Sequence, residues 1–202
     1  MILGTDSGEY EILRRAAEAV RDLDGLSIEL GLREGGGSQH MVEPLMDTSL
    51  KSRVHIAIDP YGSLPYEWKE GEVAPWVYDN TMRNNALINL YKMTHKTKVN
   101  FLFFCMLDTQ FFDRFKDGVP VFYAAEEKLL NEYVLVHFDA VHSFSVVQEE
   151  VMFFLPRTIP GSIFVFDDVT GFYDHESIEK LLFANGWVIK EKGLKKASYV
   201  KN

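Results

Sequence analysis

The stretch that decides the fold is Leu26-Ser27-Ile28-Glu29-Leu30-Gly31-Leu32-Arg33-Glu34-Gly35-Gly36-Gly37-Ser38. Residues 26–30 form an apolar run of strand length, and three consecutive glycines follow a few residues later. Glycine lets the backbone come close to a ligand and turn directly into the start of a helix. Gly31 and Gly35 are four residues apart, so the dinucleotide fingerprint G-x-G-x-x-G is not met. The stretch predicts a strand, a ligand-binding loop and a helix.

Strands and helices alternate on both sides of this stretch. A capping box at Asp6 and Glu9 predicts the start of a helix that carries residues 10–20. Other helices are expected after Gly37, over 80–93, over 145–155 and over 176–185. Further strands are expected at Val54–Ile58, Val99–Leu107, Tyr133–Phe138 and Ile163–Phe166, the last entered through a turn at Pro160-Gly161, with a closing hairpin of Trp187–Lys190 and Ala197–Val200.

This alternation predicts an α/β fold, with a mostly parallel sheet covered by helices on both faces. Residues 60–78 interrupt it with prolines, glycines and aromatic residues, which is typical of a loop that packs on something. No linker or repeat divides the chain, so we expect one domain over residues 1–202. Parallel sheets of this kind bind ligands at the carboxyl ends of their strands, which directs the search for chemistry there.

Composition excludes several classes of protein. The chain has 202 residues, 21 basic and 30 acidic, with a formal charge of −9, which argues against nucleic-acid binding through phosphates. Its one cysteine, Cys105, excludes an intramolecular disulfide, and its apolar neighbours predict a buried thiol. No stretch has the length of a membrane helix and no signal-peptide pattern is present, so we expect a cytoplasmic protein without membrane contact.

Asp59 ends the second strand, 22 residues after Gly37. An acid at this distance from a glycine loop, on the neighbouring strand, can accept both hydroxyls of a ribose. Together with Glu29 and the glycines it predicts a nucleoside site. The alternative is a turn acid that merely precedes Pro60.

Three acids follow the later strands: Asp139 after one, and Asp167 with Asp168 after the next. Adjacent parallel strands lie about 4.8 Å apart, so these carboxylates can converge on one hard divalent ion such as Mg²⁺. His142, three residues after Asp139, is a candidate general base. The alternatives are acids that only cap a strand end and a histidine that only bonds nearby backbone.

Four motifs, in this order and spacing, resemble one family: Glu29-x-Gly31 with Gly35–Ser38, then Ile58–Pro65, Asp139–Phe144, and Pro160-Gly161 with Phe166-Asp167-Asp168. The chain resembles the class I S-adenosylmethionine-dependent methyltransferases, most of all the macrocin O-methyltransferase group. The resemblance covers nearly the whole chain. Ala140 and Phe144 depart from it, since glycine and tyrosine are common at those positions.

The resemblance implies a seven-stranded Rossmann-like sheet whose last strand is antiparallel. It implies that S-adenosylmethionine is held by Asp59, Asp108 and Asp139 and by the loop residues Glu29, Gly31, Gly35, Gly36, Gly37 and Ser38. It implies a magnesium site of Asp139, Asp167 and Asp168, with His142 and Asp139 as catalytic residues. The expected reaction is metal-assisted O-methylation of a small hydroxylated acceptor, such as a sugar or natural product.

Little chain lies outside the core, so the acceptor is expected to bind residues 60–78, the N-terminal helix, or a partner subunit in a homo-oligomer. Two other functions remain open. One is a noncatalytic S-adenosylmethionine-binding module that regulates a partner. The other is an oxidative enzyme on the same scaffold, similar to cephalosporin hydroxylases, which needs iron.

Overall fold

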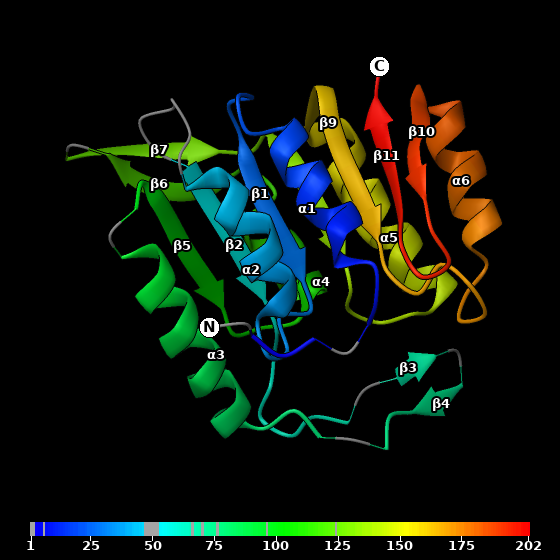
Figure 1. Ribbon diagram of the computed structural model, residues 1–202, viewed down its shortest axis with the longest axis horizontal. Helices are drawn as coiled ribbons and strands as arrows, with labels where there is room; N and C mark the ends of the chain where they lie inside the picture. The colour runs from blue at the N-terminus through cyan, green and yellow to red at the C-terminus, as the bar shows by residue number, and fades with distance from the viewer. Residues whose placement is uncertain are drawn as a thin grey trace.

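The computed structural model describes residues 3–5, 7–46, 53–65, 67–69, 71–75, 77–95, 97–123 and 125–202. Their centre is a seven-stranded sheet with strand order β10-β11-β9-β8-β1-β2-β5 (Figure 1). Its last strand, β11, is antiparallel to both neighbours, and the other pairs are parallel. The strands are β1 (Leu26–Leu30), β2 (Arg53–Ile58), β5 (Val99–Phe104), β8 (Tyr133–Phe138), β9 (Thr158–Phe166), β10 (Trp187–Lys192) and β11 (Ala197–Lys201).

The central strands are buried along their whole length because both faces of the sheet are covered. Every residue of β1, β2 and β8 is buried, as expected for parallel strands between two helical layers. Figure 1 shows α1 and α2 in front of the sheet and α4 and α5 behind it. The predicted α/β fold class is confirmed. The helices are α1 (Tyr10–Ala19), α2 (Gly36–Val42), α3 (Asn80–Thr94), α4 (Asp108–Arg114), α5 (Phe144–Phe154) and α6 (His175–Ala184), with short 3-10 turns at Glu43–Leu45 and Leu155–Arg157.

Two small ribbons were not predicted. β3 (Glu67–Lys69) pairs with β4 (Glu72–Val73) inside the expected loop, and β6 (Val119–Tyr123) pairs with β7 (Glu126–Leu130) before β8. Nearly all of β7 is exposed, so its sequence carries no apolar run to reveal a strand. Among the aromatic residues expected to pack this loop, Tyr66, Trp76 and the side chain of Trp68 lie outside the described residues.

Two strand boundaries differ from the prediction. β9 begins at Thr158 and includes Pro160-Gly161, which shifts its register against β8 instead of turning the chain. β5 ends at Phe104, three residues before the predicted end. Cys105 therefore lies beyond the edge strand, and its thiol is exposed and donates to the Pro60 carbonyl at 3.2 Å. The prediction of a buried thiol is wrong.

The predicted capping box is also wrong for Glu9. This residue precedes α1, but its carboxylate makes no capping bond there. It accepts instead the backbone N–H groups of Leu194, Lys195 and Lys196 at 2.8–2.9 Å. Asp6 lies outside the described residues. In the part of the chain that the structure describes, no helix is long and apolar enough to cross a membrane.

Candidate functional site

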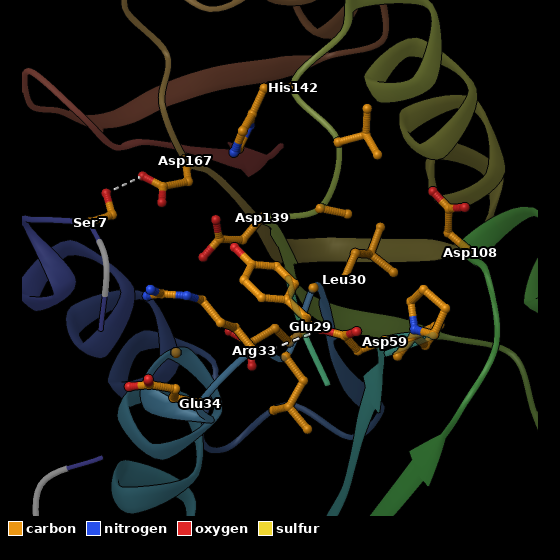
Figure 2. A pocket seen from close by; sticks show the side chains of 18 of the residues that line it. Ser7, Glu29, Leu30, Arg33, Glu34, Asp59, Asp108, Asp139, His142 and Asp167 are labelled. Atoms are coloured by element: carbon orange, nitrogen blue, oxygen red, sulfur yellow. Dashed lines mark hydrogen bonds between the residues drawn. The ribbon is translucent and has the colours of Figure 1, made fainter. Parts of the chain in front are cut away.

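A cavity of about 600 Å³ opens where β1, β2, β8 and β9 end (Figure 2). Its volume lies within the range of small-molecule sites. Residues of all four strand ends contribute to its wall, as the parallel topology predicts. Of the predicted site residues, Glu29, Gly31, Gly36, Gly37, Asp59, Asp108, Asp139, His142, Asp167 and Asp168 line the cavity, whereas Gly35 and Ser38 do not.

The glycines of the loop are required first by the protein's own packing. Gly31 has φ +87°, and a Cβ there would lie 2.1 Å from the Asp139 carbonyl oxygen. A Cβ on Gly36 would lie 2.4 Å from the Gly4 carbonyl oxygen, and one on Gly37 would lie 1.8 Å from Oε1 of Glu29. The glycines therefore let the N-terminal segment and two strand ends meet at one side of the cavity.

Glu29 is the centre of a buried hydrogen-bond network. Its carboxylate accepts the Ser38 hydroxyl at 2.5 Å and pairs with Nδ1 of His137 at 2.9 Å. The other ring nitrogen of His137 lies 3.8 Å from the Asp139 carboxylate. Nε2 of His55 lies 2.8 Å from the Ser38 hydroxyl. The network holds Glu29 and the start of α2 in fixed positions. Ser38 does not line the cavity and contributes by orienting the Glu29 carboxylate.

Asp59 is held by backbone groups. Its two oxygens accept the N–H of Arg33 at 2.9 Å and the N–H of Tyr61 at 3.0 Å. Burial raises the pKa of Asp59, while these N–H groups act to lower it. Each carboxylate oxygen has a second lone pair, so the residue can still accept two hydroxyl groups from a ligand.

Asp167 and Asp168 are both paired with lysines from the turn between β10 and β11. Nζ of Lys196 lies 2.7 Å from Oδ1 of Asp167, and both side chains are buried. Nζ of Lys195 lies 3.0 Å from Oδ1 of Asp168. The Ser7 hydroxyl also donates to Oδ1 of Asp167 at 2.8 Å (Figure 2). Burial raises the pKa of Asp167, but Lys196 and His137 outweigh it, and the pKa lies below its usual value.

The predicted magnesium site does not fit these contacts. Mg²⁺ requires carboxylate oxygens that are open to the ion. Here Oδ1 of Asp167 contacts an ammonium and two further donors, namely the Ser7 hydroxyl and the backbone N–H of Asp168 at 2.8 Å. The repulsion that suggested a divalent ion is already offset by lysine. The sequence prediction did not consider these lysines, because a lysine in a polar turn normally points into water.

His142 lies beside the acid cluster. Its Nε2 is 3.7 Å from Oδ2 of Asp168, and its side chain is 13% exposed. The ring stands near Phe172 and parallel to that of Tyr173. Figure 2 shows the imidazole above Asp167 and Asp139. A histidine in this place can take a proton from a ligand in the cavity.

Asp108 is the first residue of α4 and lies on the far side of the cavity from Asp167 (Figure 2). Glu150 of α5 is fully buried near it. Burial raises the pKa of Glu150 well above its usual value, and the charge of Asp108 raises it further. No pattern in the sequence singles out Glu150, because it occupies an ordinary helical position.

Several lining residues were missed by sequence reasoning. Arg33 follows the predicted loop glycine and lies over the ring of Tyr78, with 5.8 Å between Cζ and the ring centre. Ser7 and Lys195 come from opposite ends of the chain. A positive charge two residues after Gly31 was the one available signal, since charged residues in a ligand loop are typical of binding.

Comparison with solved structures shows what this arrangement is similar to. CalS11, a TDP-rhamnose 3'-O-methyltransferase of calicheamicin biosynthesis, superposes with a TM-score of 0.64 at 13% identity, over 95% of this chain and 77% of CalS11. The O-methyltransferase NovP superposes with a TM-score of 0.59 at 14% identity, over 96% of this chain and 79% of NovP. An O-methyltransferase from Bacillus cereus, in complex with SAH, superposes with a TM-score of 0.61 at 11% identity, over 98% of this chain and 83% of that enzyme.

No protein-family model matches the chain, and no curated protein sequence is significantly similar to it. At 11–14% identity, the superpositions establish the fold alone. The strand order, the antiparallel last strand and the position of the cavity agree with that conclusion. The chain has the seven-stranded, Rossmann-like fold of these methyltransferases.

Proposed function

We propose that the protein transfers a methyl group from S-adenosylmethionine to an oxygen of a small hydroxylated acceptor, such as a sugar or natural product. One observation carries the proposal. A nucleoside-type wall, with Glu29 and Asp59, and an acid–histidine wall, with Asp139, His142 and Asp168, line the same cavity. A protein that only bound a nucleoside would have no use for the second wall.

The cavity suits S-adenosylmethionine in size and in the groups it presents. Its volume of about 600 Å³ accommodates a cofactor together with a small acceptor. Asp59 would accept the ribose hydroxyls, Asp108 would lie near the adenine, and the loop from Glu29 to Gly37 would hold the methionine part. When bound, this cofactor supplies an electrophilic methyl group on a sulfonium.

The acceptor would lie against the other wall. His142 accepts the proton of its hydroxyl on Nε2 as the oxygen becomes nucleophilic. Asp168, 3.7 Å away, stabilises the imidazolium that results. Asp139, on the same wall, would orient the acceptor. Burial of the reacting groups excludes water, which would otherwise compete for these polar contacts.

The superposed enzymes support the choice of acceptor class. CalS11 acts on a nucleotide-linked sugar, and the other two neighbours are O-methyltransferases. The cavity is also lined by Arg33, Tyr78 and Phe172, which can pack on a sugar ring or a nucleotide base.

The experiment is transfer of isotopically labelled methyl from S-adenosylmethionine to a library of sugars, nucleotide sugars and phenols, read by mass spectrometry. Calorimetry with S-adenosylmethionine and S-adenosylhomocysteine gives binding separately. We expect binding and at least one labelled product. Absence of binding would refute the proposal, and binding without transfer to any acceptor would favour a noncatalytic module.

A further inference from the structure

We propose that Lys195 and Lys196 take the place of a divalent metal ion in this site, so that the protein works without one. For its catalytic consequence this inference rests on the proposed function. The charges themselves are present in the structure: two ammonium groups carry the same positive charge as one divalent ion, and they contact Asp167 and Asp168 directly.

Lys196 is the buried member of the pair. Its side chain is fully buried, with Nζ 2.7 Å from Asp167 and 4.3 Å from the ring centre of Tyr10. An ammonium in such a place requires a counter-charge, because an unpaired buried charge is strongly destabilising. A metal ion bound by Asp167 would repel Lys196 and take away its partner. The two cations therefore compete for the same carboxylate.

Lys195 is the member that lines the cavity. Its Nζ lies 3.0 Å from Asp168 and 5.1 Å from the ring centre of Phe172, and its side chain is 47% exposed. Asp168 is also the carboxylate beside His142. Lys195 is thus a positioning residue for the pair Asp168–His142, and its ammonium lies on the wall where the proposed acceptor would bind.

The turn that carries both lysines is fastened at several points. The Glu9 carboxylate accepts the N–H groups of residues 194–196. The Thr170 hydroxyl donates to the Leu194 carbonyl at 2.7 Å, and Val169 N–H donates to the Lys195 carbonyl at 3.0 Å. A Cβ on Gly193 would lie 2.1 Å from Oε2 of Glu9, so a larger residue there would displace the carboxylate that holds the turn. The turn is therefore held by the residue that precedes α1 and by the loop after β9, which fixes where its lysines point.

The test has a binding arm and an activity arm. Mg²⁺ or Mn²⁺ is titrated into the chelator-treated wild type and into the variants Lys196→Met and Lys195→Met, and the melting temperature and calorimetric heat are recorded. Methionine preserves much of the volume and removes the charge. We expect millimolar metal to change neither the melting temperature nor the heat of the wild type. Both should change in the variants, because loss of a lysine frees carboxylate oxygens for the ion.

In the activity arm, we expect wild-type turnover to change less than about twofold on chelation. We expect Lys195→Met to lose about 10²-fold in kcat, as when one preorganised electrostatic group is removed. Added Mg²⁺ should restore at least part of that loss. Lys192→Met is the matched control, because Lys192 lies on the same hairpin but pairs with Glu179. It should show neither effect.

Stoichiometric binding of Mg²⁺ to the wild type, or loss of its activity on chelation with recovery on adding Mg²⁺, would overturn the inference. So would variants that fold but gain no metal response. If Lys196→Met does not fold, the half-exposed Lys195 still decides the question. The binding arm needs no methyl transfer, so failure of the proposed function would appear separately, as absent cofactor binding or absent turnover.

Discussion

The two walls of the cavity neutralise their carboxylates in different ways. On the cofactor side, Glu29 and Asp59 are held by a hydroxyl, an imidazole and backbone N–H groups. On the acceptor side, Asp167 and Asp168 are held by ammonium groups. The hydroxyl and the backbone N–H groups carry no net charge, so they hold a carboxylate and leave its charge for a ligand, whereas an ammonium offsets part of that charge. The first wall is suited to binding, and the second to a charge balance that needs no added ion.

The largest expected effect lies on the acceptor side. His142→Ala removes the proposed general base and should lower kcat by about 10²–10⁴-fold. S-adenosylmethionine affinity, measured by calorimetry, should be nearly unchanged, because His142 belongs to the opposite wall. His95→Ala, at the exposed end of α3, is a control with wild-type rates. A folded His142→Ala enzyme within about threefold of wild type would show that this histidine only bonds its neighbours.

Asp59→Ala should give the opposite pattern on the cofactor side. Losing a charge-assisted contact to a ligand costs roughly 2–3 kcal/mol, so S-adenosylmethionine should bind about 30–150-fold more weakly. At saturating cofactor, kcat should change much less than with His142→Ala. Asp22→Ala, an exposed acid far from the cavity, serves as the control. Equal affinity of wild type and Asp59→Ala, measured by calorimetry, would remove Asp59 from the site.

The smallest effect concerns the stability of the network behind the cofactor wall. Burial, reinforced by the neighbouring His137, lowers the pKa of His55 from 6.5 to about 3. Below pH 6.5 His55 binds a proton in the unfolded chain but not in the folded protein. The free energy of unfolding therefore falls as the pH decreases, until about pH 3. Between pH 7 and pH 5 the loss of unfolding free energy that comes from His55 amounts to about 2 kcal/mol.

Urea denaturation of wild type and His55→Gln at the two pH values isolates this contribution. Glutamine can still bond the Ser38 hydroxyl but does not titrate. The wild type should lose about 2 kcal/mol more than the variant between pH 7 and pH 5. An identical loss in both proteins would mean that His55 takes up its proton while folded.

The helix and strand pattern was largely predictable because each apolar run belongs to one element. β1 and β8 match the predicted ranges, and the last hairpin lies where two short apolar runs and Gly193 place it. The ribbon β6–β7 was missed because β7 is nearly all exposed and carries no apolar pattern, although Val119 and Val121 of β6 are buried in the core. Pro160-Gly161 was misinterpreted because a bulge inside a strand has the same local composition as a turn.

The sequence by itself determined which residues meet at the strand ends. Parallel strands bring Glu29, Asp59, Asp139 and Asp167 to one edge whatever the side chains around them do. Only the tertiary structure decided how their charges are balanced. Lys196 is 29 residues from Asp167, and Glu9 is nearly the whole chain away from the turn that it fastens. Such pairs leave no local pattern, because the pairing of charges depends on distance in space and on burial, and neither can be calculated from order along the chain.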